Sequence, residues 1–158
     1  MGPALEAIAG GWRLTAINTI TSGVPVNLTY SPSSAFSVSS AFTYRPNLVG
    51  DIYADDPDVN NYFNAANVVI PTSASDPFGD APRNAARGPA IWVMDLGLHK
   101  SVSLVGRSRL EFRVEAFNLL NRSNFNPPNG NRSATSFGTI TSLSTTPRQI
   151  QLGVKVDF

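Results

Sequence analysis

The 158-residue sequence predicts an all-β fold of about four antiparallel strands, and three observations support this prediction. Apolar and polar residues alternate along four segments of about ten residues each, which is the period of a strand with two different faces. Long segments rich in Ser, Asn, Asp and Pro separate these strands and show no sustained helical or strand period. Charged residues make up only 15% of the chain, against about 25% in an average soluble domain.

The first strand is expected near residues 11–28, where the chain is rich in Thr, Ile and aromatic residues around Trp12. Gly23 and Pro25 interrupt its alternation. Residues 31–88 then form a predicted loop, because they have no regular apolar period. A loop of this length is uncommon in a compact soluble domain.

The second strand is predicted near residues 90–102, where apolar side chains from Trp92 to Leu98 alternate with smaller or polar ones from Val93 to His99. A short connection around residues 105–107 follows it. The third strand is predicted near 108–120, with Leu110, Phe112, Val114 and Ala116 on one face and Arg109, Glu111, Arg113 and Glu115 on the other.

The third segment also fits a helix, because Leu110, Val114, Phe117 and Leu120 have helical spacing and Ser108 with Glu111 forms a capping-box pattern. The last segment, near 148–158, favours strands. Its apolar residues occupy every second position and share a face only in a strand; they are Ile150, Leu152, Val154, Val156 and Phe158. A turn-rich second loop is expected near 121–147.

These features together predict an antiparallel transmembrane β-barrel fragment with long extracellular loops. Ten residues suit a tilted strand that crosses a bilayer, and no run of about 18 apolar residues predicts a membrane helix. The connection after His99 is short, whereas those after Tyr30 and Asn121 are long, which is the rhythm of outer-membrane barrels. No export signal is expected within residues 1–10.

Composition removes several classes of function. The net charge of +1 gives no basic footprint for nucleic acid, and the chain has no cysteine for a disulfide, a thiolate metal site or a nucleophile. With one histidine, His99, the chain cannot assemble a His-based zinc site. No phosphate-binding glycine loop or nucleophile elbow is present. We therefore expect no enzyme activity, no cofactor and no metal.

Three groups of polar or aromatic residues are candidate sites. Asp51, Asp55, Asp56 and Asp58 could attract calcium, but they lack the EF-hand spacing and are better interpreted as a solvated loop. Glu111 and Glu115 flank arginines, so ion pairs in a barrel lumen are favoured over an acid/base pair. Trp12 and Trp92 lie near strand ends, where aromatic girdles belong, although core packing would also explain them in a soluble fold.

The sequence resembles the late barrel of TonB-dependent receptors, most closely the Oar-like branch, whose full-length members begin with a carboxypeptidase-regulatory-like domain. The resemblance spans nearly the whole chain and rests on six stretches: residues 10–14 (GGWRL), 21–25 (TSGVP), 45–51 (RPNLVGD), 83–89 (RNAARGP), 112–121 (FRVEAFNLLN) and 147–152 (PRQIQL).

This resemblance implies that residues 1–158 are a C-terminal fragment of a receptor barrel in the bacterial outer membrane. It implies as partners the membrane lipid, the remaining strands of about 22, a plug domain and the barrel-assembly machinery, whose signal the alternating terminal residues up to Phe158 resemble. The sequence does not name the ligand of such a receptor. Transport by this segment alone is not expected.

Two alternatives remain open from the sequence. One is a soluble extracellular β-sandwich that binds a glycan or a surface partner through its Ser/Thr/Asn-rich loops. The other is a four-strand protomer that completes a barrel by forming an oligomer, because four strands alone leave two open edges in lipid.

Overall fold

The computed structural model describes residues 8–33, 37–73, 75–104 and 106–158. The chain divides into two compact units, each discontinuous in sequence. The first comprises Met1–Thr21, Ile91–Asn124 and Thr145–Phe158, and the second Ser22–Ala90 and Phe125–Ser144. Across the described ranges, no helix has both the length and the apolar character needed to cross a membrane.

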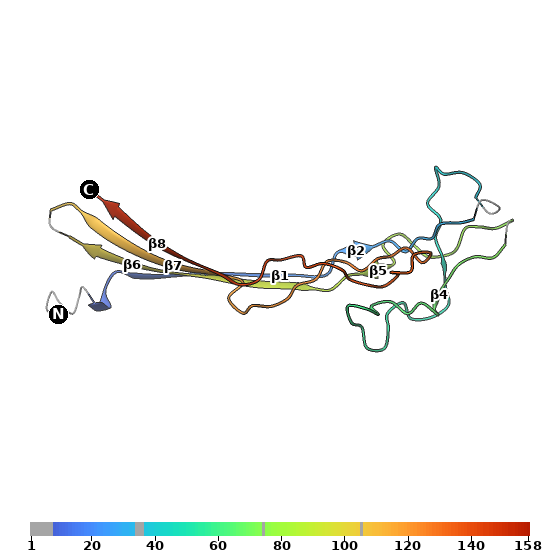
Figure 1. The fold of residues 1–158 in the computed structure, drawn as a ribbon, viewed down its shortest axis with the longest axis horizontal. Coiled ribbons are helices and arrows are strands. Elements are labelled where there is room, and N and C mark those ends of the chain that lie inside the picture. Colours follow the sequence, from blue (N-terminus) through green and yellow to red (C-terminus); the bar gives the residue numbers. More distant parts are fainter. Residues whose placement is uncertain (1–7, 34–36, 74, 105) are drawn as a thin grey trace. The chain divides into compact units, whose positions relative to one another are not determined.

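The first unit is a single antiparallel sheet with the strand order β1-β6-β7-β8 (Figure 1). Its strands are β1 (Trp12–Thr21), β6 (Ile91–Ser103), β7 (Arg109–Phe117) and β8 (Gln149–Asp157). The expectation of an all-β, antiparallel fold with about four long strands is confirmed.

The expected range of the first strand, 11–28, is wrong at its C-terminal end. Strand β1 ends at Thr21, and the short strand β2 (Pro25–Val26) pairs instead with β5 (Ala86–Arg87) in a separate sheet. Gly23 lies between them against the backbone of Gly88, where an added Cβ would overlap the carbonyl oxygen. Pro25 has no N–H to donate to a ladder, so a long strand does not continue through it.

The third segment is a strand, and its helical alternative is wrong. Strand β7 pairs with β6 on one side and β8 on the other, with Val114 opposite both Leu98 and Leu152. Two partners of the same period stabilise the extended form and bring apolar residues together. The strand ends at Phe117, short of the expected residue 120, because Asn118 adopts a positive φ of 50°.

Strands β6 and β7 are joined by a tight connection in which Leu104 N–H donates to the Ser108 carbonyl at 2.8 Å. Gly106 has a φ of 76°, a conformation that glycine adopts without a steric penalty. The short link expected after His99 is therefore present, although Val105 within it lies outside the described residues. Residues 1–7, for which no export signal was expected, also lie outside the described residues.

The second unit has little regular structure but has its own apolar core. Its ladders are two residues long: β2 with β5, and β3 (Asn47–Leu48) with β4 (Val68–Val69). The buried core cluster includes residues of three of these short strands; its members are Val26, Leu28, Phe63, Val68 and Ala86. The expected loop at 31–88 is thus largely irregular, but short ladders and a packed core give it order.

Candidate functional site

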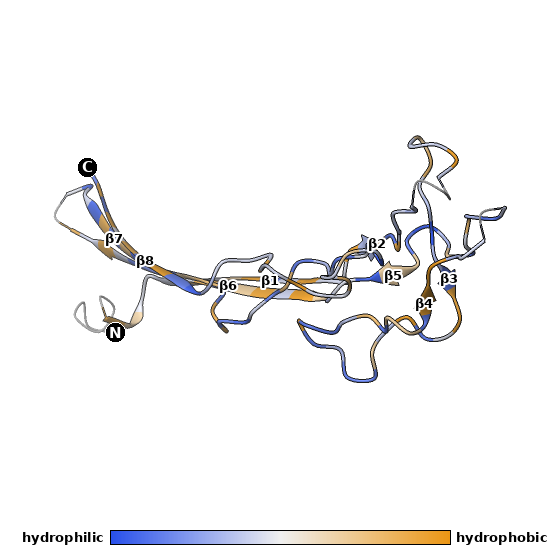
Figure 2. Ribbon diagram, turned by 45° about the vertical axis from the view of Figure 1, so that its right-hand side comes forward, coloured by the Kyte–Doolittle hydropathy of each residue, from blue (hydrophilic) through white to orange (hydrophobic). Residues whose placement is uncertain are grey.

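The four-stranded sheet has an apolar face and a polar face that carries the charged side chains together with Ile17 and Phe117, and the pairing register aligns these faces across all four strands. Val114 of β7 lies opposite Leu98 and Leu152, and Leu98 lies opposite Leu14. On the other face, Glu115 lies opposite Gly97 and Gln151. Figure 2 shows the alternation of apolar and polar residues along these strands.

Burial in this unit is inverted relative to a soluble domain. The only buried residues among its described positions are polar: His99, Asn118 and Asn124. Large apolar side chains are exposed, among them Leu14 at 66%, Leu152 at 75% and Val154 at 65%. Every buried hydrophobic residue in the described part of the chain belongs to the second unit. Water would disfavour so large an uncovered apolar surface.

A tryptophan with a cation over its ring lies near each end of the apolar face. Near the β6–β7 turn, Lys100 Nζ lies 5.1 Å from the Trp12 ring centroid and donates to the carbonyls of Ile8 and Gly10. Near the opposite end, the Arg122 guanidinium lies 5.5 Å from the Trp92 ring centroid. Both pairs have the geometry of a cation–π contact.

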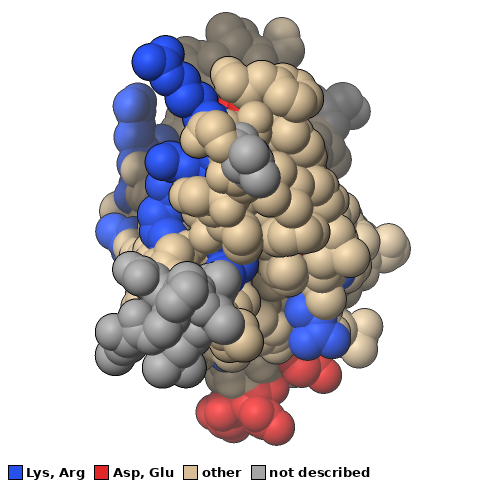
Figure 3. All heavy atoms as spheres, turned by 90° about the vertical axis from the view of Figure 1, so that its left-hand side faces the viewer, with Lys and Arg blue, Asp and Glu red and all other residues tan. Residues whose placement is uncertain are grey.

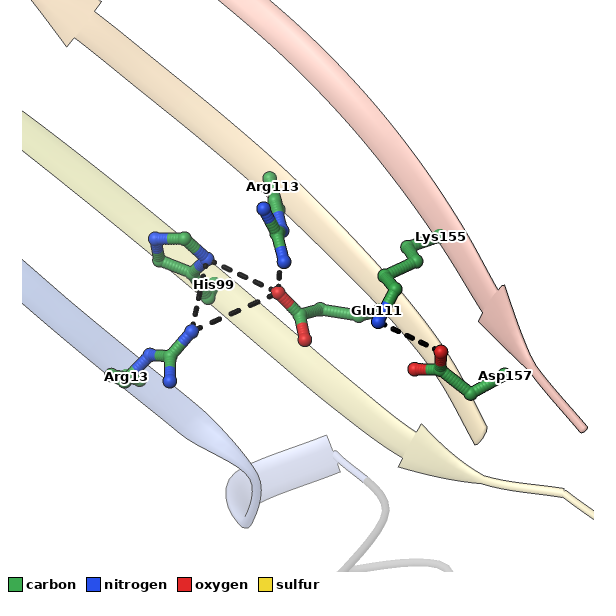
Figure 4. Close-up of polar contacts among 6 residues, drawn as sticks. All are labelled: Arg13, His99, Glu111, Arg113, Lys155 and Asp157. Atoms are coloured by element: carbon green, nitrogen blue, oxygen red, sulfur yellow. Dashed lines mark hydrogen bonds and ion pairs between the residues drawn. The ribbon is translucent and has the colours of Figure 1, made fainter. Parts of the chain in front are cut away.

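On the polar face, three side chains from three strands, Arg13, His99 and Arg113, converge on the carboxylate of Glu111 (Figure 4). Glu111 Oε1 lies 2.5 Å from Arg113 Nε, 3.3 Å from His99 Nδ1 and 3.8 Å from Arg13 Nη2. Lys155 and Asp157 form a further pair at 2.7 Å on β8. In Figure 3, most of the visible Lys and Arg side chains lie along one side, beside a broad area of uncharged side chains.

Ion pairs were expected for both Glu111 and Glu115, and within the described residues only Glu111 forms them. Glu111 pairs with Arg113 but not with Arg109. Glu115 makes no ion pair within the described ranges and lines a hollow of about 430 Å³ together with Asp95, Gly97 and His99. His99 is 9% exposed and belongs to the ion cluster.

Two of the four aspartates weighed as a calcium site, Asp51 and Asp58, act as turn acceptors. Asp51 Oδ1 accepts the Tyr53 N–H at 3.1 Å, and Asp58 Oδ1 accepts the N–H groups of Asn60 and Asn61 at 2.8 and 2.7 Å. No group of three or more metal-ligating side chains occurs in the residues that the structure describes. These contacts agree with the interpretation of this segment as a solvated loop.

The residues expected to form an assembly signal lie on the outer strand of the sheet. Ile150, Leu152, Val154 and Val156 share the apolar face of β8 and are exposed. Phe158 follows the last residue of β8 and is 98% exposed. Strand β8 is therefore an amphipathic edge strand that pairs only with β7 within the described residues.

Sequence reasoning missed the asparagines that end β7. Asn124 accepts the Trp92 N–H at 2.8 Å and donates to the Trp92 carbonyl at 3.0 Å, so its side chain acts as a bridge partner for β6. Asn118 holds Arg122 and Thr146 by side-chain hydrogen bonds. The available signal was the run of asparagines between residues 118 and 124, because asparagine tolerates positive φ and bonds to nearby backbone.

Comparison with known families gives a match to the outer membrane beta barrel domain over residues 2–151. No curated protein and no solved structure matched this chain. The family match agrees with the two-faced antiparallel sheet and its inverted burial. Since the match covers nearly the whole sequence, the chain belongs to the outer membrane beta barrel domain family and forms part of a barrel wall in the bacterial outer membrane.

Proposed function

We propose that this chain is the C-terminal part of the barrel of a TonB-dependent receptor of the Oar-like type. In this proposal its role is structural: four strands of the barrel wall and the ligand-facing outer loops of a transporter. The resemblance of six sequence stretches to such receptors supports this finer assignment. No catalytic role is proposed.

The observation that carries the proposal is the inverted burial of the four-stranded sheet. In that unit, most of the exposed large apolar side chains occupy one face, and buried polar groups and ion pairs lie on the other side or at the strand ends. A membrane barrel needs this arrangement, since its outer face contacts hydrocarbon and its lumen is polar. We therefore assign the face with Leu98, Val114 and Leu152 to lipid and the face with Glu111 to the lumen.

The distance between the tryptophans fits this assignment. Ile20 of β1 lies opposite Trp92, and Trp12 begins the same strand. Eight residue steps of about 3.3 Å separate their levels by roughly 26 Å along the strand. With a tilt of about 40°, the height is roughly 20 Å, close to the apolar band of an outer-membrane barrel.

The outer strands of the sheet indicate what it joins. Strands β1 and β8 each pair on one side only within the described residues. A barrel has no open edge, because an unpaired backbone group in hydrocarbon costs several kcal/mol. We propose that further strands of the receptor pair with β1 and β8, that a plug domain faces Glu111, and that the barrel-assembly machinery recognises β8 and Phe158.

Labelling of intact cells tests the orientation. The chain has no cysteine, so Asp56→Cys in the second unit and Arg107→Cys in the β6–β7 turn can be introduced separately into the outer-membrane protein that carries it. A membrane-impermeant maleimide should label the first variant in intact cells and the second only after the outer membrane is opened. Equal labelling of both in intact cells would exclude the proposed orientation.

The receptor assignment has a separate test. Peptides from this chain, recovered from purified outer membranes, should belong to one polypeptide that also carries a plug domain and is much longer than 158 residues. Recovery only as a 158-residue product in a stable oligomer would replace the receptor with the oligomeric barrel. A soluble fraction that holds all the peptides would favour the β-sandwich.

A further inference from the structure

Two arginines lie at the loop end of the apolar face, beyond the last paired residues of the sheet. Arg122 stacks over Trp92, whose position in the register places it on the apolar face. Arg148 precedes β8 by one residue and has the same parity as the exposed Ile150. Both arginine residues are exposed.

The backbone at both arginines is fixed by asparagine side chains. Arg122 N–H donates to Asn118 Oδ1 at 3.0 Å, and the Arg122 carbonyl accepts from Asn118 Nδ2 at 3.0 Å. Arg148 N–H donates to Asn121 Oδ1 at 3.1 Å, and its guanidinium donates to the Leu119 carbonyl at 3.4 Å. The two cations are therefore held on neighbouring backbone segments before any ligand binds, which lowers the entropy cost of binding.

The charges of these arginines are not neutralised within the described part of the chain. Neither Arg122 nor Arg148 forms an ion pair there, whereas Arg13 and Arg113 on the polar face share the carboxylate of Glu111. Unpaired guanidinium groups beside an exposed apolar surface are complementary to a ligand with an anionic head and apolar tails. Guanidinium binds phosphate oxygens by paired, charge-assisted hydrogen bonds.

We propose that Arg122 and Arg148 bind the phosphate of a lipid A headgroup in the outer leaflet, with its acyl chains on the apolar face. This inference rests on the proposed orientation, which puts the loop end of the sheet outside. The site continues the lipid-facing surface at the height where headgroups begin. Trp92 borders it and supplies the interfacial aromatic side chain.

Lipid binding to the purified, detergent-solubilised outer-membrane protein that carries this chain tests the site by native mass spectrometry. The probes are diphosphoryl lipid A and lipid A without phosphates. The unsubstituted protein should bind the first much more tightly. Arg122→Gln with Arg148→Gln should weaken that binding by about tenfold or more, because two charge-assisted contacts are lost. Inorganic phosphate should not displace the lipid.

The matched control is Arg107→Gln with Arg109→Gln, which removes the same charge near the opposite end of the strands. It should leave the affinity for diphosphoryl lipid A unchanged, and Arg122→Lys with Arg148→Lys should retain much of it. Equal binding of both lipids, retained affinity in the glutamine pair, or equal loss in the control would each overturn the proposal. If the protein with both Arg122→Gln and Arg148→Gln does not assemble, the proposal is tested by the Arg148→Gln variant alone and by comparing the binding of the two lipids to the unsubstituted protein. The cysteine labelling above stays independent of these results.

Discussion

Asparagine side chains hold the loop end of the sheet in place of regular strand pairing. Asn118 and Asn121 have φ angles of 50°, which few other non-glycine residues tolerate. Asn124 is 1% exposed and satisfies both backbone groups of Trp92 while donating to Thr145 Oγ1 at 3.1 Å. Through these hydrogen bonds, the segment that follows β7 is linked to Trp92 of β6 and to the residues that precede β8.

Replacing Asn124 by alanine should destabilise the assembled barrel by about 1 to 3 kcal/mol, because two partly buried backbone groups of Trp92 lose their partner. The measurement is reversible unfolding of the outer-membrane protein in bilayers. Asn60→Ala is the control, since Asn60 is exposed and its side chain makes no hydrogen bond within the described residues. Equal stability of the two variants would show that the Trp92 contacts contribute little.

At the scale of elements, the alternation of apolar residues predicted the bounds of β6, β7 and β8 within a few residues. It did not predict the end of the first strand, because that end depends on which segment each residue pairs with. Residues 25 and 26 looked like the end of the first strand and pair elsewhere, with β5. Residues 108–120 fitted both periods, because positions 110, 114 and 117 share a face of a helix while even positions share a face of a strand. The pairing of Val114 with Leu98 and Leu152 resolves that ambiguity. This pairing register involves three strands, so it cannot be read from the sequence of any one of them.

The two faces of β8 lead to a prediction about charged substitutions, and the pairing with β7 shows which residue lies on which face. Val154 lies opposite Phe112 on the apolar face, and Gln151 lies opposite Glu115 on the polar face. Val154→Arg should destabilise the barrel more than Gln151→Arg, because a charge on the lipid face is penalised by about 2 to 4 kcal/mol at the bilayer midplane and by less toward the interfaces. Unfolding in bilayers, followed by gel mobility, compares the two. A larger loss from Gln151→Arg would mean that the assigned faces are reversed.

The second unit should depend on its own apolar core. Phe63 is 1% exposed and packs with Leu28 and Val68. Phe63→Ala should cost about 3 to 5 kcal/mol of local stability through lost burial and the cavity left behind. Protease added to intact cells should then cut the second unit faster, while the strands stay assembled. The exposed Phe42, at 53%, supplies the control Phe42→Ala, and equal cutting of both variants would contradict a cooperative core.

At the scale of the whole molecule, the sequence predicted the two faces of the sheet but not the clusters that form on them. Glu111 and Arg113 are neighbours on one face of a single strand, so their pairing followed from alternation. The contacts of Arg13 with His99 and Glu111 depend on the register between β1 and β6, two strands separated by most of the second unit. The Trp92–Arg122 pair depends on the bend at Asn118. Local patterns do not encode such long-range registers.

The open edges of β1 and β8 lead to a prediction about the chain by itself. Expressed alone with an export signal, it should aggregate or be degraded, because each unpaired edge group left in hydrocarbon costs several kcal/mol and in water the apolar face stays uncovered. Size-exclusion chromatography with light scattering and limited proteolysis measure this outcome.

The control is the same segment within its longer polypeptide, which should be heat-modifiable and protease-resistant. A monodisperse, protease-resistant monomer in water would require a second layer over Leu14, Leu152 and Val154. A stable detergent-soluble oligomer would instead require that β1 of one copy pairs with β8 of the next.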